Sequence, residues 1–289
     1  MEEKLKASEL TLAEDGSLYH IRLHEDELAD NVILVGDPNR VKDVSQFFDK
    51  IDIKKSNREI VSHTGFYKGK HITALSTGMG VDNLDIVITE LDACKNINLK
   101  TREIKQKQTS LNLIRLGTTG AMQKDMEINS YICSKYVVGI DGMMWFYKSK
   151  NEILEKELQD KFVKHMNWNT LLPTPYSVKA SDELIEKIAF DMKQGITITA
   201  PGFYGPQGRE LRLPLRDKTI NDKLPLFSYN NYKVTNYEME TSSLYCLGKN
   251  LGHNVLTICD VVANREQGTF AKDYHSAMNN LIQIVLERL

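Results

Sequence analysis

Short apolar runs that stop at glycine- or threonine-rich turns limit most strongly how this chain can fold. Three such runs are Asn31–Val35 before Gly36-Asp37-Pro38, His71–Leu75 before Ser76-Thr77-Gly78, and Leu111–Leu116 before Gly117-Thr118-Thr119-Gly120. Brief apolar runs bounded by residues of this kind are typical of buried β-strands. We therefore predict three strands, each with a turn of small residues at its carboxyl end.

Segments with helical spacing lie between the apolar runs. In Asp82–Cys94 the apolar side chains recur at intervals typical of one helix face. Similar helices are predicted at 183–192, 241–250 and 271–289, and further strands at 130–138, 196–199 and 254–262. This alternation predicts an α/β architecture. Because ligands bind beyond the carboxyl ends of strands in such sheets, Gly36, Thr77-Gly78 and Gly117–Gly120 are expected to border one site.

Composition excludes several other classes of protein. The chain has 289 residues, of which 41% are hydrophobic, and a net charge of −2, so no overall positive field favours nucleic acid. No segment approaches the roughly 20 apolar residues that span a bilayer, and the polar N-terminus lacks a signal-peptide pattern. The four scattered cysteines fit buried thiols better than disulfides or a metal site. We expect a cytoplasmic protein.

The stretch Lys95–Asn112 is polar and rich in lysine, and it lies between a predicted helix and a predicted strand. We predict an exposed loop or hairpin here. A phosphate- or RNA-binding patch is the alternative, but only a few charges support it.

Two arginines lie near the carboxyl ends of predicted strands, one inside the strand and one after it. Arg115 lies two residues before the Gly117–Gly120 turn, whose backbone N–H groups and hydroxyls are suited to an anion. A buried arginine needs a partner, which is either that anion or an internal carboxylate. Arg40, in Gly36-Asp37-Pro38-Asn39-Arg40, begins the next predicted helix, where phosphate also binds readily, although the same turn is common without a ligand.

Two further motifs carry groups that suit a nucleoside. Phe203-Tyr204-Gly205-Pro206-Gln207-Gly208-Arg209 combines a ring for stacking with amide and guanidinium groups for a heterocycle, or it is a surface loop. Asn236–Thr241 places Glu238 and Glu240 before a helix, where a carboxylate accepts hydrogen bonds from a sugar diol or stabilises the helix N-terminus.

These four motifs, in this order, resemble the hexameric-type nucleoside phosphorylases and, among them, the uridine phosphorylases. The resemblance runs from about Tyr19 to Leu289. It implies one domain over 1–289, with a central mixed, twisted and partly closed sheet flanked by helices. It also implies that 95–112 is an insertion, because this loop is much shorter in the family.

The resemblance assigns roles to individual residues. Phosphate ligands would be Gly36, Arg40, Arg115 and Thr118, with Arg58 reaching the site of a neighbouring subunit. Ribose contacts would come from Glu238, Met239 and Glu240, with His20 again from the neighbouring subunit. The base would lie against Thr119, Gly120, Phe203, Gln207 and Arg209. Catalysis would depend on Arg115, Gln207, Arg209 and Glu240.

The implied reaction is reversible phosphorolysis of uridine, with inorganic phosphate as co-substrate and neither a metal nor an organic cofactor. Its implied partners are the nucleoside, phosphate and further copies of the chain, in a dimer or hexamer with shared sites. Val262-Ala263 stand where purine-specific relatives have a Ser-Asp pair, which favours uridine, although Asp260 lies just upstream. The alternatives are a purine nucleoside phosphorylase, a nucleoside or nucleotide hydrolase, and a non-catalytic sensor.

Overall fold

The strand β1 (Asn31–Val35) runs parallel to β4 (Lys70–Ser76) on one side and to β7 (Asn112–Ala121) on the other, in a computed structural model that describes residues 4–289. In register, Val35 lies beside both Ser76 and Leu116. The carboxyl ends of β1 and β4 therefore lie side by side, next to Leu116 of β7 and the glycine- and threonine-rich residues that follow it.

The central sheet is mixed and has twelve strands, in the order β11-β12-β10-β8-β13-β7-β1-β4-β3-β2, with β14 paired to β13 and β9 paired to β8. The remaining strands are β2 (Lys50–Asn57), β3 (Ile60–Tyr67), β8 (Tyr131–Gly139), β9 (Tyr176–Lys179), β10 (Lys193–Thr199), β11 (Ser228–Tyr229), β12 (Tyr232–Glu238), β13 (Asn254–Asn264) and β14 (Thr269–Phe270). Strand β12 also pairs with β7, through Tyr237 beside Gly120, so the sheet curls and partly closes. The predicted mixed, partly closed sheet is confirmed.

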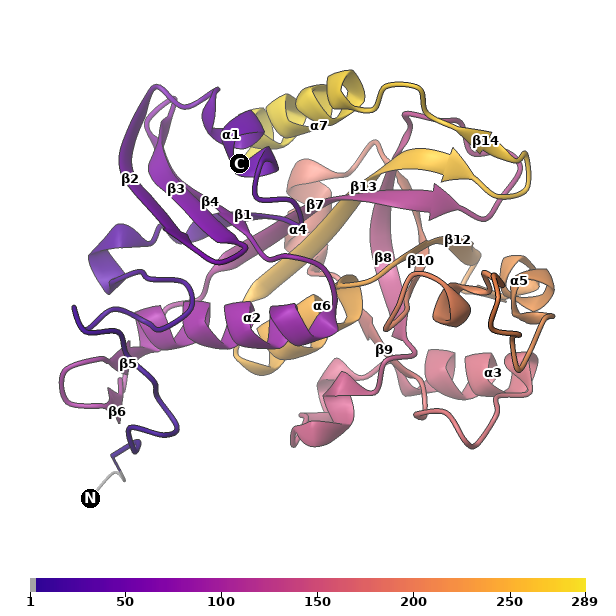
Figure 1. The fold of residues 1–289 in the computed structure, drawn as a ribbon, viewed down its shortest axis with the longest axis horizontal. Coiled ribbons are helices and arrows are strands. Elements are labelled where there is room, and N and C mark those ends of the chain that lie inside the picture. Colours follow the sequence, from indigo (N-terminus) through magenta and orange to yellow (C-terminus); the bar gives the residue numbers. More distant parts are fainter. Residues whose placement is uncertain (1–3) are drawn as a thin grey trace.

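Helices cover both faces of this sheet (Figure 1). They are α1 (Arg40–Ser45), α2 (Val81–Asn96), α3 (Lys156–Met166), α4 (Asp182–Ile188), α5 (Ile220–Lys223), α6 (Thr241–Asn250) and α7 (His275–Arg288). Helices α2 and α6 pack together, and α7 contacts both α1 and α4. Figure 1 shows α2 and α6 on one side of the sheet and α1 and α7 on the other.

Several predicted element boundaries are wrong, and the helix predicted at 271–289 begins as α7 only at His275. The strand predicted at 111–116 does not stop at Gly117 but continues as β7 to Ala121, because Gly117–Gly120 pair with β13 and β12. The helix predicted at 183–192 ends as α4 at Ile188, and Lys193 already begins β10. The glycine- and threonine-rich segment after Leu116 is thus part of the sheet rather than a turn.

The segment 95–112 contains the predicted hairpin. Its two short strands, β5 (Ile97–Asn98) and β6 (Glu103–Ile104), pair antiparallel. Two of its lysines form ion pairs, Lys105 with Glu25 at 2.5 Å and Lys95 with Asp30 at 3.0 Å. These two charges are therefore balanced within the chain.

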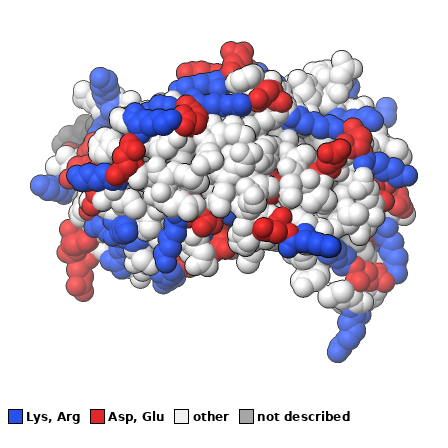
Figure 2. All heavy atoms as spheres, turned by 90° about the horizontal axis from the view of Figure 1, so that it is seen from above, with Lys and Arg blue, Asp and Glu red and all other residues white. Residues whose placement is uncertain are grey.

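The surface shows no concentration of one charge on the face drawn in Figure 2, where basic and acidic side chains alternate. All four cysteines are buried and free, as predicted. Within residues 4–289, no helix combines the length and the apolar character needed to cross a membrane.

Candidate active site

A cavity of about 720 Å³ opens where β1, β4 and β7 end. Gly36, Gly78 and Thr118–Gly120 all line it, so the predicted convergence of strand ends is confirmed. Its lining includes these residues that the sequence singled out: Gly36, Arg40, Arg115, Thr118, Thr119, Gly120, Phe203, Gln207, Arg209, Glu238, Met239 and Glu240. Residues that are far apart in the chain thus surround one space.

At the centre of this cavity, Arg115 forms buried ion pairs with two carboxylates. Its Nη2 atom donates to Glu240, and its Nη1 atom lies 3.4 Å from Glu238. Burial disfavours the charged guanidinium, but the two carboxylates outweigh this and raise the pKa of Arg115. Of the two partners proposed from the sequence, the structure shows the internal carboxylates. The Nε atom of Arg115 is buried and makes no hydrogen bond to any of the described residues, 4–289.

Gly117 leaves the space that Arg115 occupies. A Cβ atom at this position would lie 2.3 Å from Nη1 of Arg115 and 3.1 Å from Sγ of Cys259. Contacts this short force displacement, so glycine in the middle of β7 allows the guanidinium to reach Glu238 and Glu240.

The two carboxylates are held in different ways. Glu238 accepts hydrogen bonds of 2.8 Å from the backbone N–H groups of Glu240 and Thr241, at the start of α6. Burial raises the pKa of Glu238, and Arg115 partly opposes this. Glu240 accepts from the backbone N–H of Gly80 at 2.9 Å. Glu238 is therefore held by hydrogen bonds at the start of α6. Glu240 instead contacts both Arg115 and the turn after β4.

Arg40 occupies another part of the cavity, at the start of α1. It is only 8% exposed, yet among residues 4–289 it pairs with no aspartate or glutamate. Its Nη1 atom makes one long contact of 3.5 Å with the carbonyl of Leu116. A buried guanidinium with such weak protein contacts, beside Gly36 and Thr118, is suited to an anion.

Two arginines meet at the loop after β10. Arg209 donates to Oε1 of Gln207 at 2.7 Å, and Arg265 donates to the same oxygen at 3.1 Å and to the Gln207 carbonyl at 2.9 Å. In the part of the chain that the structure describes, neither arginine has an acidic partner. Burial, with the neighbouring Arg265, lowers the pKa of Arg209 to about 10. This part of the cavity carries positive charge without a counter-ion.

Arg265 is absent from the residues predicted from the sequence. It follows β13 directly, in Asn264-Arg265, so the same signal of an arginine at a strand end was available. The amide oxygen of Gln207, expected to face a heterocycle, is occupied by the two guanidinium groups instead.

Phe203 is 49% exposed, and the guanidinium of Arg209 lies 3.7 Å from the centre of its ring. Arg209 thus lies over one face of the ring, and the side chain of Phe203 remains about half exposed. Tyr237, Val262, Ala263 and Phe270 add apolar surface to the same cavity.

His20 and Arg58 lie outside this cavity. Nδ1 of His20 is 2.6 Å from Oε1 of Glu90, and Arg58 is exposed in the turn between β2 and β3 with φ of 54°. A role for either residue therefore requires the site of a neighbouring subunit, and this stays a prediction.

Comparisons with known proteins agree with this geometry. The sequence model described as "Phosphorylase superfamily" matches residues 30–289. The chain belongs to the phosphorylase superfamily.

Among similar proteins is a uridine phosphorylase of Thermococcus kodakarensis, 31% identical over 278 residues, which cover 94% of this chain and 86% of that protein. A DeoD-type purine nucleoside phosphorylase of Geobacillus stearothermophilus is 29% identical, covering 93% of this chain and 97% of that protein. A crystal structure of a Trypanosoma brucei nucleoside phosphorylase, described as showing uridine phosphorylase activity, has a TM-score of 0.87 and 28% identity, with coverage of 97% and 99%. This phosphorylase is thus a pentosyltransferase of the nucleoside phosphorylase family.

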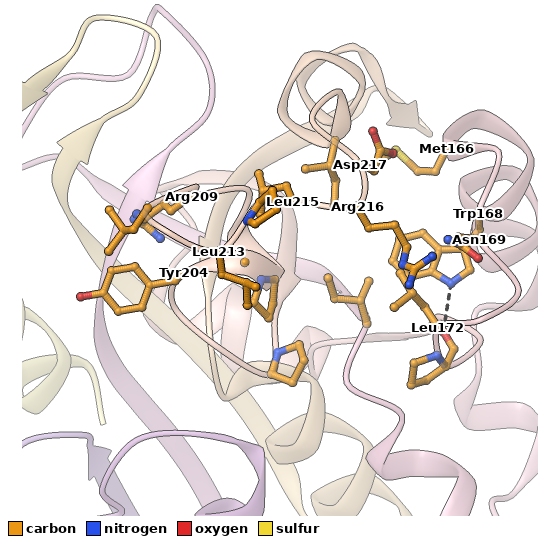
Figure 3. Close-up of a pocket in the computed structure, with 18 of the residues that line it drawn as sticks. Met166, Trp168, Asn169, Leu172, Tyr204, Arg209, Leu213, Leu215, Arg216 and Asp217 are labelled. Carbon is orange, nitrogen blue, oxygen red and sulfur yellow. Dashed lines mark hydrogen bonds between the residues drawn. The ribbon is translucent and has the colours of Figure 1, made fainter.

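A second cavity of this phosphorylase, of about 620 Å³, lies beside the 203–209 loop (Figure 3). Figure 3 shows Tyr204 and Arg209 at one end and Arg216 near Trp168 at the other. Its walls are mainly apolar, and it contains neither Arg115 nor the two glutamates. We therefore place the chemistry in the first cavity. Within residues 4–289 no group of three or more His, Cys, Asp or Glu could hold a metal ion.

Proposed function

We propose that this phosphorylase cleaves uridine reversibly with inorganic phosphate, giving uracil and ribose 1-phosphate. The observation that carries the proposal is the convergence of Arg209 and Arg265 on Gln207 without an acidic partner. A pyrimidine leaves the sugar as an anion, and fixed donors without a counter-ion stabilise negative charge that develops there. The uridine phosphorylase named among the similar proteins supports the same substrate.

Purine phosphorolysis is the second candidate, because a DeoD-type purine nucleoside phosphorylase is almost as similar. A departing purine benefits from an acid that protonates its ring nitrogen. Val262 and Ala263 line the cavity where that acid would stand, and Asp260 is fully buried rather than part of the lining. These residues favour uridine over inosine.

In the proposed reaction, phosphate would bind between Arg40, Thr118 and the Gly36 backbone. Arg115 would bridge phosphate and sugar, because its guanidinium already contacts Glu240. Glu240 and the Met239 region would hold the ribose hydroxyls, so that phosphate attacks C1′ on the side opposite the base. The contribution of this chain is to position both reactants and to stabilise the charge on the base.

We also infer that the active form is a homo-oligomer, a dimer or a hexamer. Arg58 and His20 lie outside the cavity of their own chain, and in this proposal they complete the site of a neighbouring copy. An enzyme with this activity would serve pyrimidine salvage in the cytoplasm.

The experiment is to incubate the purified enzyme with uridine or inosine, with and without phosphate, and to separate the products. We expect uracil and ribose 1-phosphate from uridine only when phosphate is present. Base release without phosphate would instead show a hydrolase, and binding of uridine without base release would show a non-catalytic sensor.

A further inference from the structure

Asp260 is a buried carboxylate that the proposed mechanism does not use. It lies on β13 and has no exposed surface. Within residues 4–289, neither of its carboxylate oxygens has a hydrogen-bond partner. An ionised carboxylate without hydrogen bonds is costly in the protein interior, so a group in this setting requires either a proton or a neighbouring charge.

Asp260 lies in the sheet next to the part of the cavity where phosphate is predicted to bind. In the parallel pairing of β13 with β7, Asp260 lies directly beside Thr118, so both side chains project from the same face of the sheet. Thr118 lines the cavity, as does Val262, two residues beyond Asp260 on β13. Asp260 therefore adjoins a predicted phosphate ligand without reaching the cavity surface.

Two ionisable side chains act on Asp260. Arg40, from α1, favours its charged form, and Tyr131, from β8, has its own pKa raised by burial and by the Asp260 charge. The hydroxyl of Tyr131 donates to the carbonyl of Ala277 at 2.8 Å, so it does not neutralise Asp260. Burial outweighs the attraction of Arg40 and raises the pKa of Asp260 to about 6.

A dianion that binds to Arg40 and Thr118 changes this balance. It engages the guanidinium that favours the ionised form of Asp260, and it places new negative charge above the carboxylate. Ionised Asp260 would repel the dianion, whereas a protonated carboxyl is neutral and can donate one hydrogen bond. Binding of the anion and protonation of Asp260 therefore favour each other.

We propose that Asp260 takes up a proton from solvent when phosphate binds, and that its neutral form positions Arg40 and Thr118 around the anion. The inference rests on the phosphate site of the proposed function. In this role Asp260 is a positioning residue, because it acts through Arg40 and Thr118.

Sulfate is the cleanest probe, because it remains a dianion across the neutral pH range and exchanges no proton of its own. Sulfate binding is measured by calorimetry at pH 7.5 in two buffers with different ionisation enthalpies, for the wild type, Asp260→Asn and Asp125→Asn. Asp125 is the matched control, since it is an exposed aspartate paired with Lys193 at 2.7 Å. The dependence of the heat on the buffer counts the protons taken up.

We expect the wild type and Asp125→Asn to take up a large fraction of one proton per site, and Asp260→Asn to take up none. Sulfate affinity should fall up to about tenfold per pH unit above pH 7 in the wild type and stay level in Asp260→Asn. Binding without proton uptake by the wild type, or unchanged uptake by Asp260→Asn, would overturn the inference. If Asp260→Asn does not fold, the wild-type proton count decides alone. Proton-coupled sulfate binding by an enzyme that does not cleave uridine would uphold this inference while contradicting the proposed function.

Discussion

Arg115 and Glu240 form an ion pair inside the cavity, and Glu238 lies 3.4 Å from the same guanidinium. The pair connects β7, which carries the predicted phosphate ligands Arg115 and Thr118, with the segment 238–240 before α6, which supplies predicted ribose ligands. In the proposed reaction, the guanidinium of Arg115 therefore lies between the phosphate and the ribose.

Replacing Glu240 with glutamine tests this connection. We expect kcat/KM for uridine to fall by about 100-fold, because the ribose loses a charged acceptor and Arg115 loses a fixed partner. The fold should persist, since Glu238 remains beside Arg115 and glutamine can still accept from Gly80. Glu157→Gln, which removes an exposed ion pair on α3, is the control and should leave the kinetics unchanged. Equal kinetics for the two variants would contradict the role of Glu240.

Arg209 and Arg265, which lie where the base is predicted to bind, give a second prediction. Arg209→Ala and Arg265→Ala should each lower kcat by roughly 10²–10³-fold, the cost typical of one lost donor to a developing negative charge. The double variant should lose less than the product of the two, because both side chains act on the same Gln207 oxygen.

Arg216→Ala is the matched control for these variants, since this exposed arginine of the same chain segment lines only the second cavity. Thermal unfolding and uracil release are measured for all four proteins. Near-normal activity of Arg209→Ala would show that the base is recognised elsewhere.

Subunit complementation tests the predicted role of Arg58. Arg58→Ala and Glu240→Gln are each expected to be nearly inactive alone. If Arg58 contributes to the site of the neighbouring subunit, a dimer of one chain of each variant contains one site with neither defect. Unfolding and refolding the two variants together should therefore restore activity. For random pairing in dimers, the restored activity is up to about a quarter of the wild-type value. No gain on mixing would mean that each chain completes its own site.

Asp260 predicts how stability depends on pH, independently of any ligand. Its folded-state pKa of about 6 is above the ordinary value of 3.8, so the folded state holds the proton more tightly. The stability contributed by Asp260 should therefore be lost as pH rises from about 4 through 6, and it should not return at higher pH. Asp260→Asn should melt roughly 2–4 °C above the wild type at pH 8, and the difference should shrink toward pH 4. A lower melting temperature at pH 8 would show that the ionised carboxylate is stabilising.

The sequence predicted the central strands well because their apolar runs are continuous and end at small residues. Strand β1 and helix α6 were predicted with the bounds that the structure shows. Helix α3 was missed, although Leu158, Phe162 and Met166 recur at intervals of four and form its buried face. The hairpin of β2 and β3 was missed because β2 is largely polar, with alternating exposure.

The site was predictable as a set of residues but not as a set of contacts. Motifs at strand ends indicated that Gly36, Gly78 and Thr118 would meet, and all three line the cavity. The continuation of β7 through Gly117 depends on pairing with β13, which lies over a hundred residues away in the chain. Ion pairing of Arg115 and the convergence of Arg265 on Gln207 likewise arise only when distant strands are brought together.

The most direct test of substrate choice is a competition between uridine and inosine at equal concentration, with saturating phosphate, in one reaction. The rates of uracil and hypoxanthine release give the ratio of the two kcat/KM values. The unpaired positive charge of Arg209 and Arg265 predicts that uracil release exceeds hypoxanthine release by at least about tenfold. Faster release of hypoxanthine would contradict the assignment of this site to a pyrimidine.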